Sequence, residues 1–376
     1  MELQYPGSDT LAINKATPPG CQPINKPTAI IKADALAYLI WDVADLEKQE
    51  TFLTDFGMLT ERKTSKELYM RGYGDAPYLY FGRKAKKSAF IGIGFKVNSR
   101  QDLVTLSQKT GEKIQKISRI GGGEMVSLLD PNGLVIEVTF GIAQVAPVAT
   151  RREVLVANTA DSIVRVNSGQ RAPLMPSPVL KLGHCVTGTL NFEETVQWYL
   201  VHLGLIVTDA LCLADGSPTV TFMRFDRGDE PSDHHAIVVG KGGGEGYLHS
   251  AYEVVDMDAV AQGQQYLKMK KQYKHFWGIG RHILGSQVFD YWHGPDHFEF
   301  EHYADGDVYT SDHPTQYHPL DTGNIYAWGH DLPKAMFALK PAQVWGIVRG
   351  LFNGDVSFTW LKQAKQAVSR PARPWL

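Results

Sequence analysis

An internal repeat constrains the fold of this chain more than any other feature of its 376 residues. The segments that begin at Leu36 and Leu182 each read as a short apolar strand, a turn and an amphipathic helix. Residues 88–97 and 246–255 match as buried strands that lead into a second helix. The sequence therefore predicts two copies of a unit built from paired β-α-β-β-β elements.

The most similar pair of segments lies at the end of each copy, DPNGLVIEVTFG from Asp130 and GPDHFEFEHYADG from Gly294. Each segment is a turn around a proline followed by a strand. The glutamate six residues after the proline is Glu137 in the first copy and Glu301 in the second. A duplicated unit of this kind can curl a sheet into an open cup, and a small polar site fits inside such a cup.

The two copies differ in the side chains that can bind a metal. All 13 histidines of the chain lie at or after His184. At the inner positions of three strands, the second copy carries His184, His249 and Glu301. Two imidazoles and one carboxylate, with three positions left open, form the facial triad of non-haem Fe(II) enzymes. The matching residues of the first copy are Tyr38, Ile91 and Glu137.

Glu299 competes with Glu301 for the role of carboxylate ligand. Strand alternation places both side chains on the same face, so facing does not decide between them. Only Glu301 has the same offset from its proline as Glu137. The repeat therefore favours Glu301.

The motifs KLGHCV, YLHSAYEV and GRHILGSQVFDYW…FEFEHYADGD resemble the type I extradiol ring-cleaving dioxygenases of the vicinal oxygen chelate superfamily, over roughly residues 30–306. The resemblance implies an α+β fold of two tandem modules, each an open cup-like partial barrel, with a metal-free first module. It implies Fe(II), with Mn(II) as the alternative, and a catecholic substrate that reacts with O2. The ring would open next to the diol, giving a muconic semialdehyde-type product in the degradation of aromatic compounds.

Three further residues match positions of that family. The resemblance implies that His235, fourteen residues before His249, takes a proton from the catechol and later returns one. An imidazole suits this role because it exchanges protons near neutral pH. The resemblance also implies that His282 lies beside the ligands and that Tyr291 contacts a catecholic oxygen. A structural histidine and a packed aromatic are the alternatives for these two, and His234 is expected to face solvent.

The repeat and the resemblance together predict five segments. They are an N-terminal extension (1–29), a metal-free module (30–143), a linker (144–177), a metal-binding module (178–306) and a C-terminal extension (307–376). The extension contains WGHDLP, expected as a lid or a subunit contact. The turn GPDH departs from the family pattern because His297 stands where glycine is usual.

Composition limits the remaining classes of function. A net charge of −2 without a basic stripe gives no nucleic-acid footprint. No segment approaches the roughly 18 apolar residues of a membrane span, and the polar N-terminus predicts no signal peptide. Three widely spaced cysteines make no disulfide framework, so a reducing cytoplasm is expected. A homo-oligomer is expected as well.

Three alternatives to an extradiol dioxygenase follow from the same pattern. Two are metalloenzymes of the superfamily, a glyoxalase-type isomerase and a hydroxyphenylpyruvate-type dioxygenase. The third is a ligand-sequestering module of the bleomycin-resistance kind, without catalysis. The joint presence of His235, His282 and Tyr291 favours the extradiol reaction over the two metalloenzymes. The ligand-sequestering proteins are usually far shorter and lack the three metal ligands.

Overall fold

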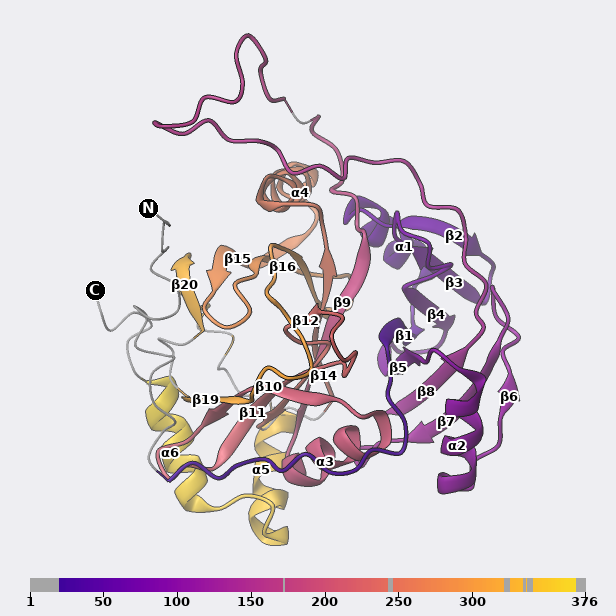
Figure 1. Cartoon of the computed structure of the whole chain (residues 1–376), viewed down its shortest axis with the longest axis vertical. Helices are drawn as coiled ribbons and strands as arrows, with labels where there is room; N and C mark the ends of the chain where they lie inside the picture. The colour runs from indigo at the N-terminus through magenta and orange to yellow at the C-terminus, as the bar shows by residue number, and fades with distance from the viewer. Residues whose placement is uncertain are drawn as a thin grey trace.

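The computed structural model describes residues 20–171, 173–242, 246–320, 325–333, 336 and 341–369. The first 19 residues, part of the stretch in which the sequence predicts no signal peptide, lie outside this part of the chain. The described residues form two large open sheets, one from each half of the repeat (Figure 1). The tandem α+β architecture is therefore confirmed, whereas the bounds of the five segments stay predictions.

The first sheet contains eight strands in the order β2-β3-β4-β1-β5-β8-β7-β6. Two β-α-β-β-β units meet at its centre, where β1 and β5 pair antiparallel. The first unit comprises β1 (Ala35–Val43), α1 (Leu46–Asp55), β2 (Leu59–Lys63), β3 (Glu67–Arg71) and β4 (Tyr80–Lys84). The second comprises β5 (Ala89–Lys96), α2 (Arg100–Thr110), β6 (Gln115–Lys116), β7 (Glu124–Leu129) and β8 (Val135–Phe140).

The second sheet repeats this plan around the antiparallel pair β9 and β14. Its first unit comprises β9 (Lys181–Thr189), α3 (Phe192–Leu203), β10 (Ile206–Cys212), β11 (Pro218–Arg224) and β13 (Ile237–Lys241). Its second comprises β14 (Gly246–Glu253), α4 (Met257–Lys270), β15 (Lys274–His282), β16 (Val288–His293) and β17 (Glu299–Ala304). A separate two-stranded sheet joins β12 (Ser232–Asp233) to β18 (Val308–Tyr309).

The C-terminal extension completes the second sheet at both edges. Strand β19 (Gln316–Pro319) pairs with β10, and β20 (Tyr326–Gly329) pairs with β15. Edge strands leave backbone groups unpaired, and these two additions satisfy groups of β10 and β15. Helices α5 (Pro341–Asn353) and α6 (Phe358–Val368) follow, at the bottom of Figure 1.

Local signals in the sequence explain where the helices begin and end. Helix α2 starts with a capping box, in which Ser99 and Asp102 each satisfy a backbone N–H of the other. It stops at Gly111, whose φ of 81° is the left-handed conformation that suits glycine. Helix α4 starts at Asp256, whose carboxylate accepts a hydrogen bond from the N–H of Ala259.

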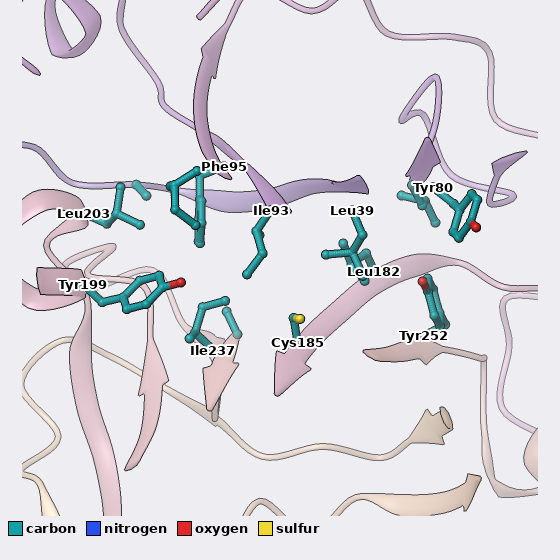
Figure 2. Close-up of a cluster of buried hydrophobic side chains, with 14 of the residues drawn as sticks. Leu39, Tyr80, Ile93, Phe95, Leu182, Cys185, Tyr199, Leu203, Ile237 and Tyr252 are labelled. Atoms are coloured by element: carbon teal, nitrogen blue, oxygen red, sulfur yellow. The ribbon is translucent and has the colours of Figure 1, made fainter. Parts of the chain in front are cut away.

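The main hydrophobic core lies between the two sheets. Figure 2 shows Leu39 and Ile93 of the first sheet facing Leu182, Cys185 and Ile237 of the second. Side chains alternate along a strand, so the neighbours of the core residues Leu39 and Cys185 point to the opposite faces. Those neighbours include Tyr38 and His184. The side chain of His184 therefore lies on the face of the second sheet that points away from this core, which is called the outer face of each sheet.

The pairing of the strands corrects one position of the predicted overlay. In the first sheet, Ile40 pairs with Gly92, and in the second the equivalent Val186 pairs with His249. The counterpart of His249 is therefore Gly92 and not Ile91. A Cβ on Gly92 would lie 2.0 Å from the carbonyl oxygen of Val135, so this position has no room for any side chain.

Candidate metal centre

Three neighbouring strands supply the predicted ligands. His184 lies on β9, His249 on β14 and Glu301 on β17, and β14 is hydrogen-bonded to both other strands. A β-bulge interrupts the pairing of β9 just before His184, at Gly183. Bulges re-aim side chains, and glycine is required here because a Cβ would lie 2.1 Å from the Tyr303 hydroxyl.

The ligand atoms of His184, His249 and Glu301 all lie within 4.8 Å of one another. The Nε2 atoms of His184 and His249 are 3.1 and 3.3 Å from Glu301 Oε2. His184 and Glu301 are buried, whereas 19% of the His249 side chain is exposed. The cluster is thus closed by protein on one side and accessible on another, as a three-ligand site with open positions requires.

The electrostatics of Glu301 suit a cation. Burial raises the pKa of this carboxyl, but the hydrogen bonds and charges of His184 and His249 outweigh burial and hold the pKa below its usual value. Oε1 of Glu301 is buried without a hydrogen-bond partner, and so is Nδ1 of His184. An ionised, completely buried carboxylate with an unsatisfied oxygen is costly unless a positive charge lies beside it. The residues present therefore fit a divalent metal.

Glu299, the competing carboxylate, does not belong to this cluster. It lies on β17 opposite His249 in the strand pairing, whereas Glu301 lies opposite Ala251. The group of metal-ligating side chains contains Glu301 alone of the two. The assignment of Glu301 as a ligand stays a prediction, supported by this placement.

His282 and Tyr291 form a hydrogen-bonded pair beside the cluster. Nδ1 of His282 donates to the carbonyl oxygen of Ile325 at 2.8 Å, because a carbonyl can only accept. Burial lowers the pKa of His282 to about 4, so the ring is neutral near pH 7 and its Nε2 is an acceptor. The Tyr291 hydroxyl therefore donates to His282 Nε2 over 3.0 Å. Its oxygen keeps lone pairs with which it can accept another hydrogen bond.

Aromatic side chains form a wall next to Tyr291. The ring of Trp277 stacks on that of Tyr291 with centroids 5.5 Å apart, and Phe289 packs against both. The indole N–H of Trp277 donates to the carbonyl oxygen of His330, a residue of the WGHDLP segment. The C-terminal extension is thus in contact with the wall, although its role as a lid stays a prediction.

The structure places His235 within the same site. Its ring centroid lies 4.2 Å from that of His184, and the residue is buried. Burial lowers the pKa of His235 well below its usual value, and the nearby imidazoles of His184 and His234 lower it further. His235 is therefore neutral near pH 7 and can accept a proton.

His234 differs from its prediction, because it is completely buried and does not face solvent. Its Nδ1 lies 2.8 Å from Nδ1 of His235, and its Nε2 lies 2.5 Å from Asp209 Oδ2. His318 of the C-terminal extension approaches the other oxygen of Asp209 at 2.8 Å. Sequence reasoning missed Asp209 and His318, since neither has a motif and they come together only through the pairing of β10 with β19.

The first module has a different group at the equivalent place. The Tyr38 hydroxyl donates to Glu137 at 2.6 Å, and the guanidinium of Arg119 donates to both Tyr38 and Glu137. Arg119 also lies over the rings of Tyr38 and Phe81. A protein cation, the guanidinium of Arg119, therefore lies beside the glutamate of the first module, where the second module has the cluster of candidate ligands.

A cavity of about 760 Å³ lies elsewhere, between the two modules. Its lining includes Tyr38 and Tyr78 of the first module and Lys181 and Asp233 of the second. None of the three candidate ligands lines it. The candidate centre is therefore located by the convergence of its three ligand side chains and not by this cavity.

No helix in the described part of the chain has both the length and the apolar character needed to cross a membrane.

Comparisons with known proteins agree with the resemblance read from the sequence. No family model matches the chain. Metapyrocatechase 2 from Cupriavidus necator is 26% identical to it over 307 residues, which are 78% of this chain and 88% of that protein. The resemblance to extradiol dioxygenases is thereby confirmed.

Solved structures agree on the fold. Homoprotocatechuate 2,3-dioxygenase from Brevibacterium fuscum superposes with a TM-score of 0.68 at 19% identity, covering 84% of this chain and 95% of that one. The enzyme of the same name from Arthrobacter globiformis gives 0.67 at 18%, covering 84% and 94%. An Mn(II)-bound glyoxalase from Novosphingobium aromaticivorans gives 0.68 at 22%, covering 82% and 95%. The fold is the tandem vicinal oxygen chelate fold.

Proposed function

We propose that this chain is an Fe(II)-dependent extradiol dioxygenase that cleaves a catechol next to its diol with O2, in the degradation of aromatic compounds. The observation that carries the proposal is the convergence of His184, His249 and Glu301, with His235 and the Tyr291 hydroxyl beside them. Metapyrocatechase 2, the relative found by sequence, supports the same reaction.

The three ligands would hold Fe(II), which supplies a Lewis acid for the two catechol oxygens and the electron chemistry that activates O2. Two imidazoles and one carboxylate suit Fe(II), and they also suit Mn(II), the ion of the glyoxalase structure. Fe(II) is proposed as the working ion because dioxygen chemistry needs a metal that changes its oxidation state readily.

His235 and Tyr291 divide the work on the substrate hydroxyls. Neutral His235 takes the proton of one hydroxyl at its ring nitrogen and later returns a proton to the opened product. The Tyr291 hydroxyl donates a hydrogen bond to His282, so its oxygen can accept a hydrogen bond from a catechol hydroxyl. Because burial and the Glu301 charge raise the pKa of Tyr291 far above its usual value, this phenol stays protonated.

The aromatic wall formed by Trp277, Phe289 and Tyr291 suits a planar ring. These side chains lie on the adjacent strands β15 and β16, and Tyr291 is also perpendicular to His249, with centroids 5.1 Å apart. A ring held against His249 and Tyr291 would present its diol toward the ligand cluster. This arrangement supports a catechol as the substrate class.

A glyoxalase-type isomerase is the second candidate, because a glyoxalase has the same fold at comparable similarity. Such an enzyme would rearrange a hemithioacetal without consuming O2. His235 beside His184 gives a proton acceptor for a diol, and the Tyr291 oxygen, whose hydroxyl donates to His282, gives a hydrogen-bond acceptor. This observation favours ring cleavage.

The decisive experiment measures O2 uptake by anaerobically Fe(II)-loaded protein with catechol, 3-methylcatechol, 4-methylcatechol and 2,3-dihydroxybiphenyl. Uptake with formation of a yellow ring-fission product is expected. The same protein, loaded with Mn(II), is tested with methylglyoxal and glutathione. Thioester formation without O2 uptake would replace the dioxygenase by the isomerase, and a protein that retains no metal would overturn both.

His235→Phe separates metal binding from proton transfer. The phenyl ring preserves the bulk beside His184 but carries no proton, so turnover should fall by roughly 10²–10⁴-fold. Metal content should stay unchanged, as measured by elemental analysis of the purified protein. A variant with normal turnover would remove His235 from the mechanism.

A homo-oligomer in the cytoplasm is proposed on separate observations. Residues 156–171 form a loop that projects from the body at the top of Figure 1, and its exposed side chains include Val156, Ile163 and Val166. Several exposed apolar side chains on one projecting loop suit a subunit contact. Three free cysteines suit a reducing compartment. Sedimentation analysis of the purified protein tests the assembly, and a monomer would refute it.

A further inference from the structure

We propose that Asp209 and His234 are positioning residues that fix the ring orientation and tautomer of His235, so that its Nε2 is an acceptor toward the substrate. The role rests on the proposed dioxygenase function. The residues form one buried row, in which Asp209 contacts His234 and His234 contacts His235. The C-terminal extension joins the row through His318.

The carboxylate of Asp209 determines which groups donate and which accept the hydrogen bonds along this row. An ionised carboxylate only accepts hydrogen bonds, so both imidazoles that reach it must donate. His234 therefore carries a hydrogen on Nε2, the nitrogen 2.5 Å from Oδ2, and His318 carries one on the Nε2 that lies 2.8 Å from Oδ1. Burial leaves few other partners for these groups, since Asp209, His234 and His318 are all at most 5% exposed.

The position of the hydrogen on His234 then determines the position of the hydrogen on His235. The proposal requires that His234 carries a single hydrogen, the one on Nε2, which leaves a lone pair on its Nδ1. Two imidazole nitrogens 2.8 Å apart share a hydrogen bond only if one of them donates, so Nδ1 of His235 must donate to Nδ1 of His234. A neutral His235 with its hydrogen on Nδ1 has a bare Nε2. The row thereby leaves Nε2 as the nitrogen that can accept the proton of a substrate hydroxyl.

Neighbouring contacts hold the row in place. The backbone carbonyl of His234 accepts a hydrogen bond from the Thr208 hydroxyl at 2.7 Å, and the N–H of His234 donates to the carbonyl of Asp307 at 2.8 Å. Phe222 packs against both imidazoles, with centroids 5.6 and 5.3 Å away. The backbone of His234 is thus held independently of Asp209, so an isosteric change at Asp209 should alter the hydrogen bonding more than the fold.

The test compares the wild-type protein with Asp209→Asn, in which the side chain keeps its shape but can also donate. Histidine-labelled protein loaded with Zn(II), which is diamagnetic, gives nitrogen NMR shifts that distinguish the two tautomers of each ring. We expect His235 to carry its hydrogen on Nδ1 in the wild type and to shift toward the Nε2-protonated form in the variant. With Fe(II), kcat should fall by about 10²-fold, while KM for the catechol and metal content change less than about twofold.

Asp290→Asn is the matched control. Asp290 is another completely buried carboxylate of the same sheet, and its Oδ1 lies 2.8 Å from His275. This change should lower stability but leave the tautomer of His235 unchanged. His318→Gln, whose amide can still donate to Asp209, should likewise preserve the tautomer.

Two results would overturn the proposal. One is a wild-type spectrum in which His235 carries its hydrogen on Nε2, which decides the question even if Asp209→Asn fails to fold. The other is an Asp209→Asn variant with an unchanged tautomer and a kcat within about twofold of the wild type. The spectra test the tautomer separately from the proposed function, because they require no turnover. A protein without ring cleavage could still show the predicted tautomer.

Discussion

The two modules share one scaffold and differ in what occupies the outer face of each sheet. In the first module a cluster of buried rings, among them Tyr38, Tyr69 and Tyr78, covers this face and encloses the guanidinium of Arg119. In the second module the equivalent face carries imidazoles and stays partly accessible. Since the eight strands of the repeat have the same order and pairing in both sheets, the fold alone does not produce the site.

Both modules have a buried glutamate at the same place in the sheet. Glu137 of β8 pairs with Gly94 of β5, and Glu301 of β17 pairs with Ala251 of β14. The first module neutralises its carboxylate with a residue of its own, Arg119. The second offers two imidazoles, and one oxygen of its carboxylate has no hydrogen-bond partner. The comparison teaches that the same buried glutamate has a protein cation beside it in the first module, whereas in the second module the residues around it fit a metal.

Exchanging each glutamate for glutamine gives the largest expected difference between the modules. Glu301→Gln should abolish metal retention and reduce ring cleavage to the level of metal-free protein, because the only anionic ligand is lost. Glu137→Gln should leave both metal content and turnover per folded chain unchanged. Elemental analysis and O2 uptake measure the two effects.

Glu299→Gln is the control for this pair, since it alters a glutamate of the same strand outside the ligand cluster. If Glu299→Gln lost the metal while Glu301→Gln retained it, the choice of ligand would be wrong. If Glu137→Gln also lost the metal, the contrast between the modules would fail.

Removing the cation of the first module should cost stability without affecting chemistry. Arg119→Met preserves much of the length and apolar contact of the side chain but leaves Glu137 buried without its partner. Breaking a buried pair in this way costs about 3–5 kcal/mol of unfolding free energy. Denaturant unfolding measures the loss. Arg100→Met, which removes an exposed ion pair to Glu124, is the control, and its effect on the unfolding free energy should be much smaller because solvent screens this pair. Equal losses in the two variants would contradict the role of Arg119.

Gly92, the counterpart of His249, shows why the first module cannot carry a ligand side chain at this position. Gly92→Ala places a Cβ 2.0 Å from the Val135 carbonyl oxygen, and a backbone atom cannot move aside cheaply. We expect a loss of about 3 kcal/mol, the upper end of what overpacking costs. Gly240→Ala in the second module is the matched control, because its Cβ would meet only one atom, at 4.0 Å. A tolerated Gly92→Ala would mean that the absence of a histidine there has no steric cause.

The sequence predicted the repeat and the ligand cluster because both depend on residue identity at fixed offsets. It failed where strand register decides, since glycine-rich β5 has no pattern that distinguishes Ile91 from Gly92 as the partner of β1. The prediction that His234 faces solvent was wrong, because His234 and His235 lie between β12 and β13, outside any regular strand, and both are buried. Asp209 and His318 lie 109 residues apart, and only the pairing of β10 with β19 joins them.

Metal binding gives the smallest and most specific difference. A metal that binds only the folded protein stabilises it by about 2.7 kcal/mol when its free concentration is 100 times its dissociation constant. Because His184, His249 and Glu301 lie on three strands of the second sheet, this stabilisation should be confined to that sheet. Amide hydrogen exchange with and without metal tests this: β9, β14 and β17 should gain protection, whereas β1, β5 and β8 should not. The Glu301→Gln protein should show no gain anywhere. Equal protection of both sheets would mean that the core between them couples the modules so tightly that they open as one unit, and that the difference between them is chemical but not energetic.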